Sequence, residues 1–256
     1  PPVALFLAPP GLLPRGVARV LWNSLNAMAL GYFFVAVTRS LRRVLPVPWW
    51  VVVVAVGLSS EFIQHLFVLG QIEGCILALL AVFIGQAQPR PWLAAAALAL
   101  VILIKIPYGL VLLWAVYERQ YAQLWRVPLC LTALIASAFL VFGVAGTLEQ
   151  FAAWQALLAS TTAPLLCLRS NQSLWAMLCT VTDMPPEHLW RLAVPLSVLF
   201  ISSGVWVSLA IRQRARTETE RALAGMVFLA WLLYGAAVLS PLGWRTNLIS
   251  ITPMVM

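Results

Sequence analysis

The stretch PWLAAAALALVILIKIPYGLVLLWAV, residues 91–116, decides the class of this protein. Residues 94–104 are apolar at every position, without the alternation that marks a transmembrane β-strand, so the stretch favours a helix in a bilayer. The whole chain fits this environment, because 62% of its 256 residues are apolar, 9% are charged and the mean hydropathy is +0.94. We therefore predict an all-α, polytopic transmembrane protein with about seven or eight passes, forming one domain over residues 1–256.

Lys105 and Pro107 interrupt the apolar stretch at its middle, and Arg90 and Arg119 flank it. A single crossing would put one basic flank on each side of the membrane, whereas short basic loops face the cytoplasm. Pro107 also breaks helical hydrogen bonding. We therefore predict a broken helical hairpin with residues 105–108 at its outer tip.

The other basic residues extend this topology along the chain. The net charge of +8 is divided among loops between apolar spans and forms no single face, which excludes a nucleic-acid partner and favours a topology signal. The predicted inner loops contain Arg39, Arg42 and Arg43, then Arg90, then Arg119 and Arg126, and finally Arg212, Arg214, Arg216 and Arg221. The partners expected on this ground are membrane lipids.

Between two of these inner loops, a long outer segment runs over residues 146–188. Its residues 148–160 have apolar side chains at helical spacing with Glu149, Gln150 and Gln155 between them, which predicts a helix lying in the interface. Cys167 and Cys179 either pair in an oxidising compartment or stay free, and two free thiols are favoured. No cysteine or histidine spacing indicates a metal site.

Polar residues gather on the predicted outer face. A charge inside a span costs about 2.5–3.5 kcal/mol on insertion scales, so Lys105 and Glu73 are functional candidates, although a residue near a helix end can also merely cap or snorkel. The outer group comprises Glu61, Gln64, His65, Gln71, Glu73, Lys105, Arg169, Asn171, Gln172, Ser173, Ser240, Trp244, Arg245 and Asn247. No nucleotide-binding loop, metalloprotease motif or nucleophile elbow accompanies them, which excludes the common soluble enzyme classes.

Five segments, in order along the chain, resemble glycosyltransferase family 87, a family of polytopic GT-C transferases. They are the opening PPVALFLAP of residues 1–9, GQIE of residues 70–73, KIPY of residues 105–108, NQSL of residues 171–174 and SPLGW of residues 240–244. Glu73 stands where the family often has Asn, and the family's last motif often carries His where this chain has residues 245–247.

The resemblance implies transfer of a sugar, mannose or another hexose or pentose, from a polyprenyl-phosphate donor to a lipid or glycan acceptor at the outer face of a bacterial inner membrane. Under this hypothesis Lys105, Arg169 and Arg245 bind the donor phosphate. The sugar and acceptor are bound by Gln71, Asn171, Gln172, Ser173, Trp244 and Asn247, without a cofactor or metal.

The family's catalytic acid lies in a first outer loop, so we expect the base upstream of Pro1 and interpret the chain as a fragment that also lacks C-terminal spans. Two other classes remain open. A transporter or flippase would use the same polar group as a midplane site, although such proteins usually show internal repeats that are missing here. A noncatalytic scaffold would leave Gln71, Lys105, Asn171 and Trp244 far apart.

Overall fold

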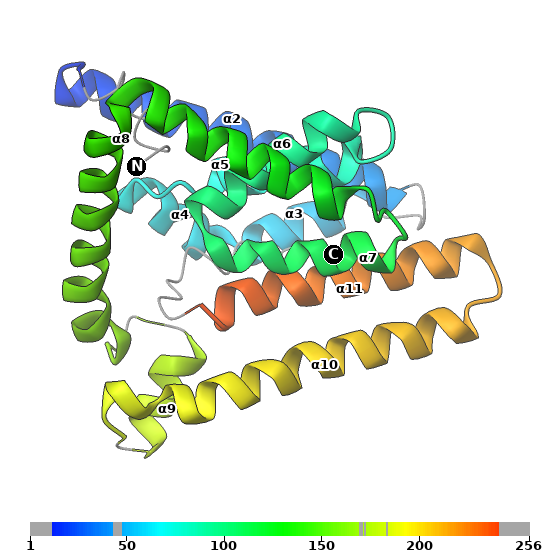
Figure 1. The fold of residues 1–256 in the computed structure, drawn as a ribbon. Coiled ribbons are helices and arrows are strands. Elements are labelled where there is room, and N and C mark those ends of the chain that lie inside the picture. Colours follow the sequence, from blue (N-terminus) through cyan, green and yellow to red (C-terminus); the bar gives the residue numbers. More distant parts are fainter. Residues whose placement is uncertain (1–11, 43–47, 169–170, 172, 183, 241–256) are drawn as a thin grey trace.

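The computed structural model describes residues 12–42, 48–168, 171, 173–182 and 184–240. These residues form helices, as predicted (Figure 1). In chain order the elements are α2 (Arg15–Arg42), α3 (Trp49–Leu58), α4 (Ser60–Leu69), α5 (Glu73–Gln86), α6 (Pro91–Ile104), the 3-10 turn η1 (Ile106–Leu110), α7 (Val111–Tyr117), α8 (Gln123–Leu166), α9 (Leu174–Thr182), η2 (Pro186–His188), α10 (Trp190–Arg214) and α11 (Glu218–Val238).

The predicted break within residues 91–116 is confirmed. Pro91 occupies the first turn of α6, which ends at Ile104, and Lys105 has extended backbone angles (φ −150°, ψ 96°) before η1 and α7. Gln123 follows α7 and donates from Nε2 to the carbonyls of Ala87 and Pro91, each at 3.4 Å. The start of α8 is therefore fastened to the start of α6, at the end of the hairpin opposite Lys105 (Figure 1).

The expected number of passes is not reached in the described part of the chain. Four helices there, α2, α8, α10 and α11, are long and apolar enough to cross a membrane, and α3 with α4 makes a fifth if this pair, bent by 54°, is one span. The helices α5 and α6 have 14 residues each, which is short of the roughly 20 that a crossing needs. The prediction of seven or eight passes included the broken hairpin, of which α6 is one arm.

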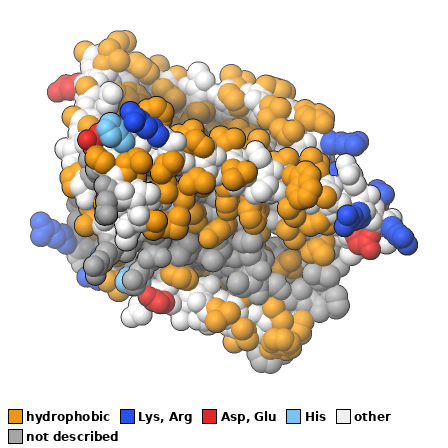
Figure 2. All heavy atoms as spheres, turned by 90° about the horizontal axis from the view of Figure 1, so that it is seen from below, with side chains coloured by type: hydrophobic (Ala, Val, Ile, Leu, Met, Phe, Trp, Pro, Cys, Tyr) orange, Lys and Arg blue, Asp and Glu red, His pale blue; other side chains and the backbone are white. Residues whose placement is uncertain are grey.

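The core lies between α2, α5, α6, α7 and α11. Phe33, Leu77, Leu98, Val111 and Leu232 are almost completely buried there. Half of the apolar window of α11 is buried, against 11% of the corresponding window of α10. Apolar side chains cover much of the outer surface, and the charged ones gather toward its two ends (Figure 2). This distribution fits a bundle surrounded by lipid.

The helices run back and forth between two ends of the bundle (Figure 1). We call the end that carries Arg42, Arg90, Arg126 and Arg212 the basic end, and the end that carries residues 70–73 and 105–108 the hairpin end. Contacts hold the basic end together: the Arg126 guanidinium lies 5.6 Å from the Trp92 ring, and that of Arg212 lies 4.5 Å from the Tyr117 ring. The described arginines of the predicted inner loops thus share one end, whereas Arg43 lies outside the described residues. The side of the membrane that this end faces stays a prediction.

Helix α8 contains a break at Gly143, whose φ of 68° and ψ of 176° are not helical. Glycine adopts this positive φ without the steric cost that a side chain would add. Beyond the break, α8 turns away from its first half and crosses the hairpin end (Figure 1). Residues 152–160 are all exposed. The predicted helix over residues 148–160 is thus present outside the packed bundle, and its place in the lipid interface stays a prediction.

Cys167 and Cys179 form a disulfide, so the expectation of two free thiols was wrong for this pair. Their Cα atoms lie 5.6 Å apart. Cys75 and Cys130 are free. A disulfide in this segment fits an oxidising compartment, which agrees with its predicted place outside the membrane.

Candidate functional site

A buried ion pair joins the two polar positions that interrupt the apolar sequence. Lys105 Nζ lies 2.7 Å from Glu73 Oε1, and the two side chains are 18% and 4% exposed. Glu73 is the first residue of α5, and Lys105 directly follows α6. The pair therefore ties the tip of the hairpin to the start of the preceding helix.

The local sequence holds Lys105 in place from both sides. Its N–H donates to the Val101 carbonyl at 2.8 Å, and its carbonyl accepts from the Tyr108 N–H at 3.2 Å. Pro107 cannot continue α6, so the chain leaves the helix at this point. Tyr108 is 1% exposed, and Lys105 Nζ lies 6.0 Å from the centre of its ring. The ammonium is thus held by a carboxylate and by an aromatic ring.

The turn that precedes Glu73 is fastened to α2. Gly70 ends α4 with a φ of 64°, and its carbonyl accepts a hydrogen bond from Trp22 Nε1 at 2.8 Å. Next to Glu73, a Cβ built on Gly74 would lie 2.8 Å from the carbonyl oxygen of Asn26, which is completely buried in α2. The close approach of α2 and α5 at Gly74 therefore fixes where the Glu73 carboxylate lies.

This geometry provides charge and hydrogen-bonding capacity at the hairpin end. Glu73 Oε2 is buried and has no hydrogen-bond partner among the described residues. Lys105 Nζ donates one of its N–H groups to Glu73. Gln71 is half-buried in the same turn, and its side-chain amide makes no hydrogen bond to the described part of the chain. The site can therefore offer a cation and an amide to an anionic, hydroxyl-bearing ligand.

The side chains of Asn171 and Ser173 form hydrogen bonds within their own segment of the chain. Asn171 Nδ2 donates to the Leu166 carbonyl at 2.9 Å, and its Oδ1 accepts from the Ser173 N–H at 3.1 Å. Ser173 Oγ accepts from the Ala176 N–H at 3.2 Å and thereby caps α9. Both residues are buried. These bonds occupy groups that the sequence interpretation assigned to the sugar, and binding by these two residues stays a prediction.

The remaining predicted site residues, Arg169, Gln172, Trp244, Arg245 and Asn247, lie outside the described residues. Gln71 and Lys105 both lie at the hairpin end, because Lys105 pairs with Glu73, two residues after Gln71. The segment of Asn171 reaches the same end, because Trp175 Nε1 donates to the carbonyl of Leu239, just after α11, at 3.1 Å. No three His, Cys, Asp or Glu side chains in the described part of the chain are arranged to hold a metal ion.

Sequence reasoning singled out Glu73 and Lys105 but did not pair them. The available signal was that two intramembrane residues of opposite charge, 32 positions apart, each begin or end a short apolar arm.

A second cluster was missed at the basic end, where Arg212 donates to the Tyr117 carbonyl. Burial there raises the pKa of the Glu118 carboxyl, and the charge of Arg212 opposes this increase.

Comparisons with known proteins agree with this architecture. The sequence profile of glycosyltransferase family 87 matches residues 1–241. The chain is 25% identical over 264 aligned positions to an alpha-(1->3)-arabinofuranosyltransferase of Corynebacterium glutamicum. The alignment covers 100% of this chain and 58% of that relative. No solved structure matches.

Proposed function

Since the chain belongs to glycosyltransferase family 87, we propose that it transfers a sugar from a polyprenyl-phosphate donor to a lipid or glycan acceptor at the outer face of a bacterial inner membrane. The relative named an arabinofuranosyltransferase favours a pentose over the mannose expected from the sequence. The observation that carries the proposal is the Glu73–Lys105 pair at the hairpin end, away from the arginines of the basic end.

Transfer from a lipid phosphate needs a cation where negative charge develops on the departing phosphate. Lys105 Nζ supplies this charge, and Glu73 orients the ammonium through the 2.7 Å contact. Gln71, next to Glu73 in the turn, would orient sugar hydroxyls.

Arg169 and Arg245 are proposed as further phosphate ligands, and Gln172, Trp244 and Asn247 as sugar or acceptor ligands, on the sequence interpretation alone. The catalytic base is not assigned to any described residue. Glu73 is excluded from that role as long as its carboxylate neutralises Lys105, because a base must be available to take up the acceptor proton.

The test separates the charge of Lys105 from its structural role. The double variant Glu73→Gln/Lys105→Met removes both charges and leaves no unpaired ion in the bundle. In the full-length protein, assayed in proteoliposomes with polyprenyl-phosphate arabinofuranose and an arabinan acceptor, we expect kcat/KM to fall by about two to three decades. Lys105→Arg should retain part of the activity, because the charge remains while the geometry differs.

The matched control is Arg191→Gln, which removes a cation from the first turn of α10, where its guanidinium lies 5.9 Å from the ring of Trp190. Near-normal transfer by the double variant would refute the role of Lys105 in catalysis. Movement of the donor lipid across the bilayer by the unaltered protein, without glycosidic bond formation, would instead favour the transporter class.

A further inference from the structure

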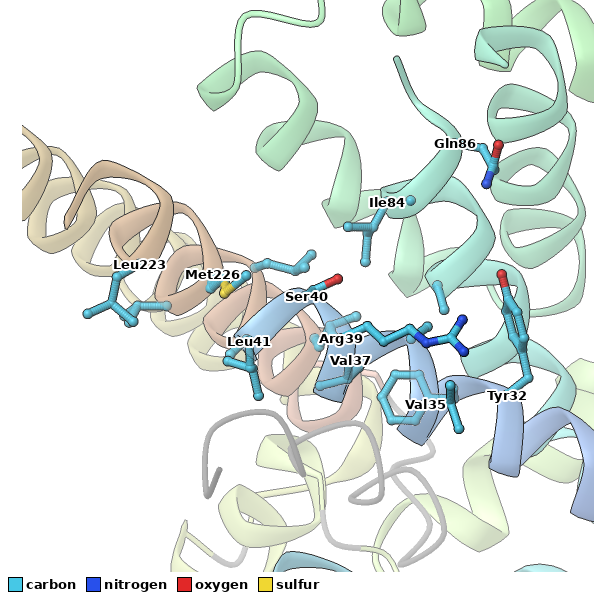
Figure 3. A pocket seen from close by; sticks show the side chains of 18 residues that line it. Tyr32, Val35, Val37, Arg39, Ser40, Leu41, Ile84, Gln86, Leu223 and Met226 are labelled. Atoms are coloured by element: carbon cyan, nitrogen blue, oxygen red, sulfur yellow. The ribbon is translucent and has the colours of Figure 1, made fainter. Parts of the chain in front are cut away.

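A cavity of about 530 Å³ lies between α2, α5 and α11, well apart from the Glu73–Lys105 pair. It is lined by the last third of α2, the second half of α5 and the first two-thirds of α11, so it belongs to the half of the bundle near the basic end (Figures 1 and 3). Its volume is in the range of about 300–1,000 Å³ that is usual for ligand pockets.

The walls of this cavity suit hydrocarbon. Phe33, Ala81 and Leu233 are nearly fully buried and form its floor, whereas Val35 and Val227 are 48% and 40% exposed. The exposed side chains belong to helices that are candidate membrane spans. An apolar chain can therefore enter the cavity sideways from the bilayer.

Among the described residues that line the cavity, one is charged. Arg39 lies in the last turn of α2, and its guanidinium is directed back along α2 toward Tyr32, within the cavity (Figure 3). The described residues that line the cavity include no acidic one, and Arg39 forms no ion pair with the described part of the chain. Gln86 adds an amide to the same lining. An apolar groove with an exposed guanidinium among its lining residues fits a ligand with a hydrocarbon chain and an anionic head group.

We propose that this cavity binds an anionic phospholipid of the cytoplasmic leaflet, with its phosphate at Arg39 and an acyl chain along the groove. Basic pockets between transmembrane helices on the cytoplasmic side bind anionic head groups, and the basic end is the predicted cytoplasmic side. The donor lipid is the less suitable occupant, because its phosphate is proposed to bind Lys105 at the opposite end of the bundle.

The test measures which lipids stay bound. The full-length protein is reconstituted in bilayers of phosphatidylglycerol and phosphatidylcholine in equal amounts, and retained lipids are counted by native mass spectrometry. We expect phosphatidylglycerol to be retained about fivefold over phosphatidylcholine, the ratio that one arginine near a head group provides. Arg39→Gln should bring the ratio close to one. The matched control Arg214→Gln, an arginine at the same end that does not line the cavity, should keep it.

A second variant tests the groove itself. A Cβ added at Gly85 meets no atom within 4 Å, so Gly85→Leu can extend into the cavity without disturbing the fold and should abolish retention of both lipids. Unchanged preference in Arg39→Gln, equal loss in Arg214→Gln, or displacement of phosphatidylglycerol by added polyprenyl phosphate would each overturn the proposal. Sugar transfer is measured separately, so a failure here leaves the role of Lys105 untouched, and the reverse also holds.

Discussion

The Glu73–Lys105 ion pair should show strong coupling in a double-mutant cycle. Lys105→Met leaves a carboxylate that is 4% exposed without its counter-ion, and breaking a buried pair in this way costs about 3–5 kcal/mol. Glu73→Gln leaves the ammonium, whose side chain is 18% exposed and closer to water, so the expected cost is about 1–3 kcal/mol. The double variant removes both charges and should recover most of the loss, with a coupling free energy of about 2 kcal/mol or more.

The free energy of unfolding is measured for the full-length protein in mixed micelles by titration with a denaturing detergent. Glu218→Gln, a change at an exposed residue in the first turn of α11, is the matched control and should stay within about 0.5 kcal/mol of the unaltered protein. Additive losses in the double variant would refute the reasoning, because they would mean that the carboxylate and the ammonium are solvated independently.

Three further changes test the packing and the loops. Gly74→Ala should destabilise the protein by about 1–3 kcal/mol, because its Cβ would lie 2.8 Å from the Asn26 carbonyl oxygen, whereas Gly57→Ala, where the Cβ meets nothing, should not. Serine at both ends of the Cys167–Cys179 disulfide should lower the melting temperature and make the short loop it closes sensitive to protease, and unchanged proteolysis would contradict this. Burial raises the folded-state pKa of the Glu118 carboxyl. The contribution of Glu118 to the free energy of unfolding should therefore be complete below the ordinary glutamate pKa of about 4.3 and be lost as the pH rises through the folded-state pKa. In Glu118→Gln, the melting temperature should decrease less steeply with pH across this range. An unchanged dependence on pH would exclude Glu118 as its cause.

The class of the protein and the course of its hairpin could be read from residues 91–116. A bilayer offers no water to backbone groups, so a long apolar run must satisfy its hydrogen bonds within itself, and this local requirement makes it helical. Pro107 ends that helix for an equally local reason. The grouping of the described arginines at one end was also predicted from local sequence, because the positive charge of each short loop indicates the side of the membrane on which it lies.

The candidate site was predicted only in part. Glu73 and Lys105 stood out because each charge is costly in an apolar context. Their pairing depends on how the start of α5 meets the tip of the hairpin, and that meeting is set by the approach of α2 and α5 at Gly74. The amide of Asn171, which was predicted to bind the sugar, also holds backbone groups of its own turn, and sugar binding by it stays a prediction.

By itself, the sequence determined that the chain is helical, where the helices of the hairpin break and which loops share an end, because these depend on hydropathy, proline and charge within short windows. Only the tertiary structure decided that Lys105 pairs with Glu73, that Cys167 joins Cys179, and that Arg39 lines an apolar cavity. These features depend on contacts between segments whose relative positions are set by side-chain packing over the whole bundle, and no short window of sequence contains that information.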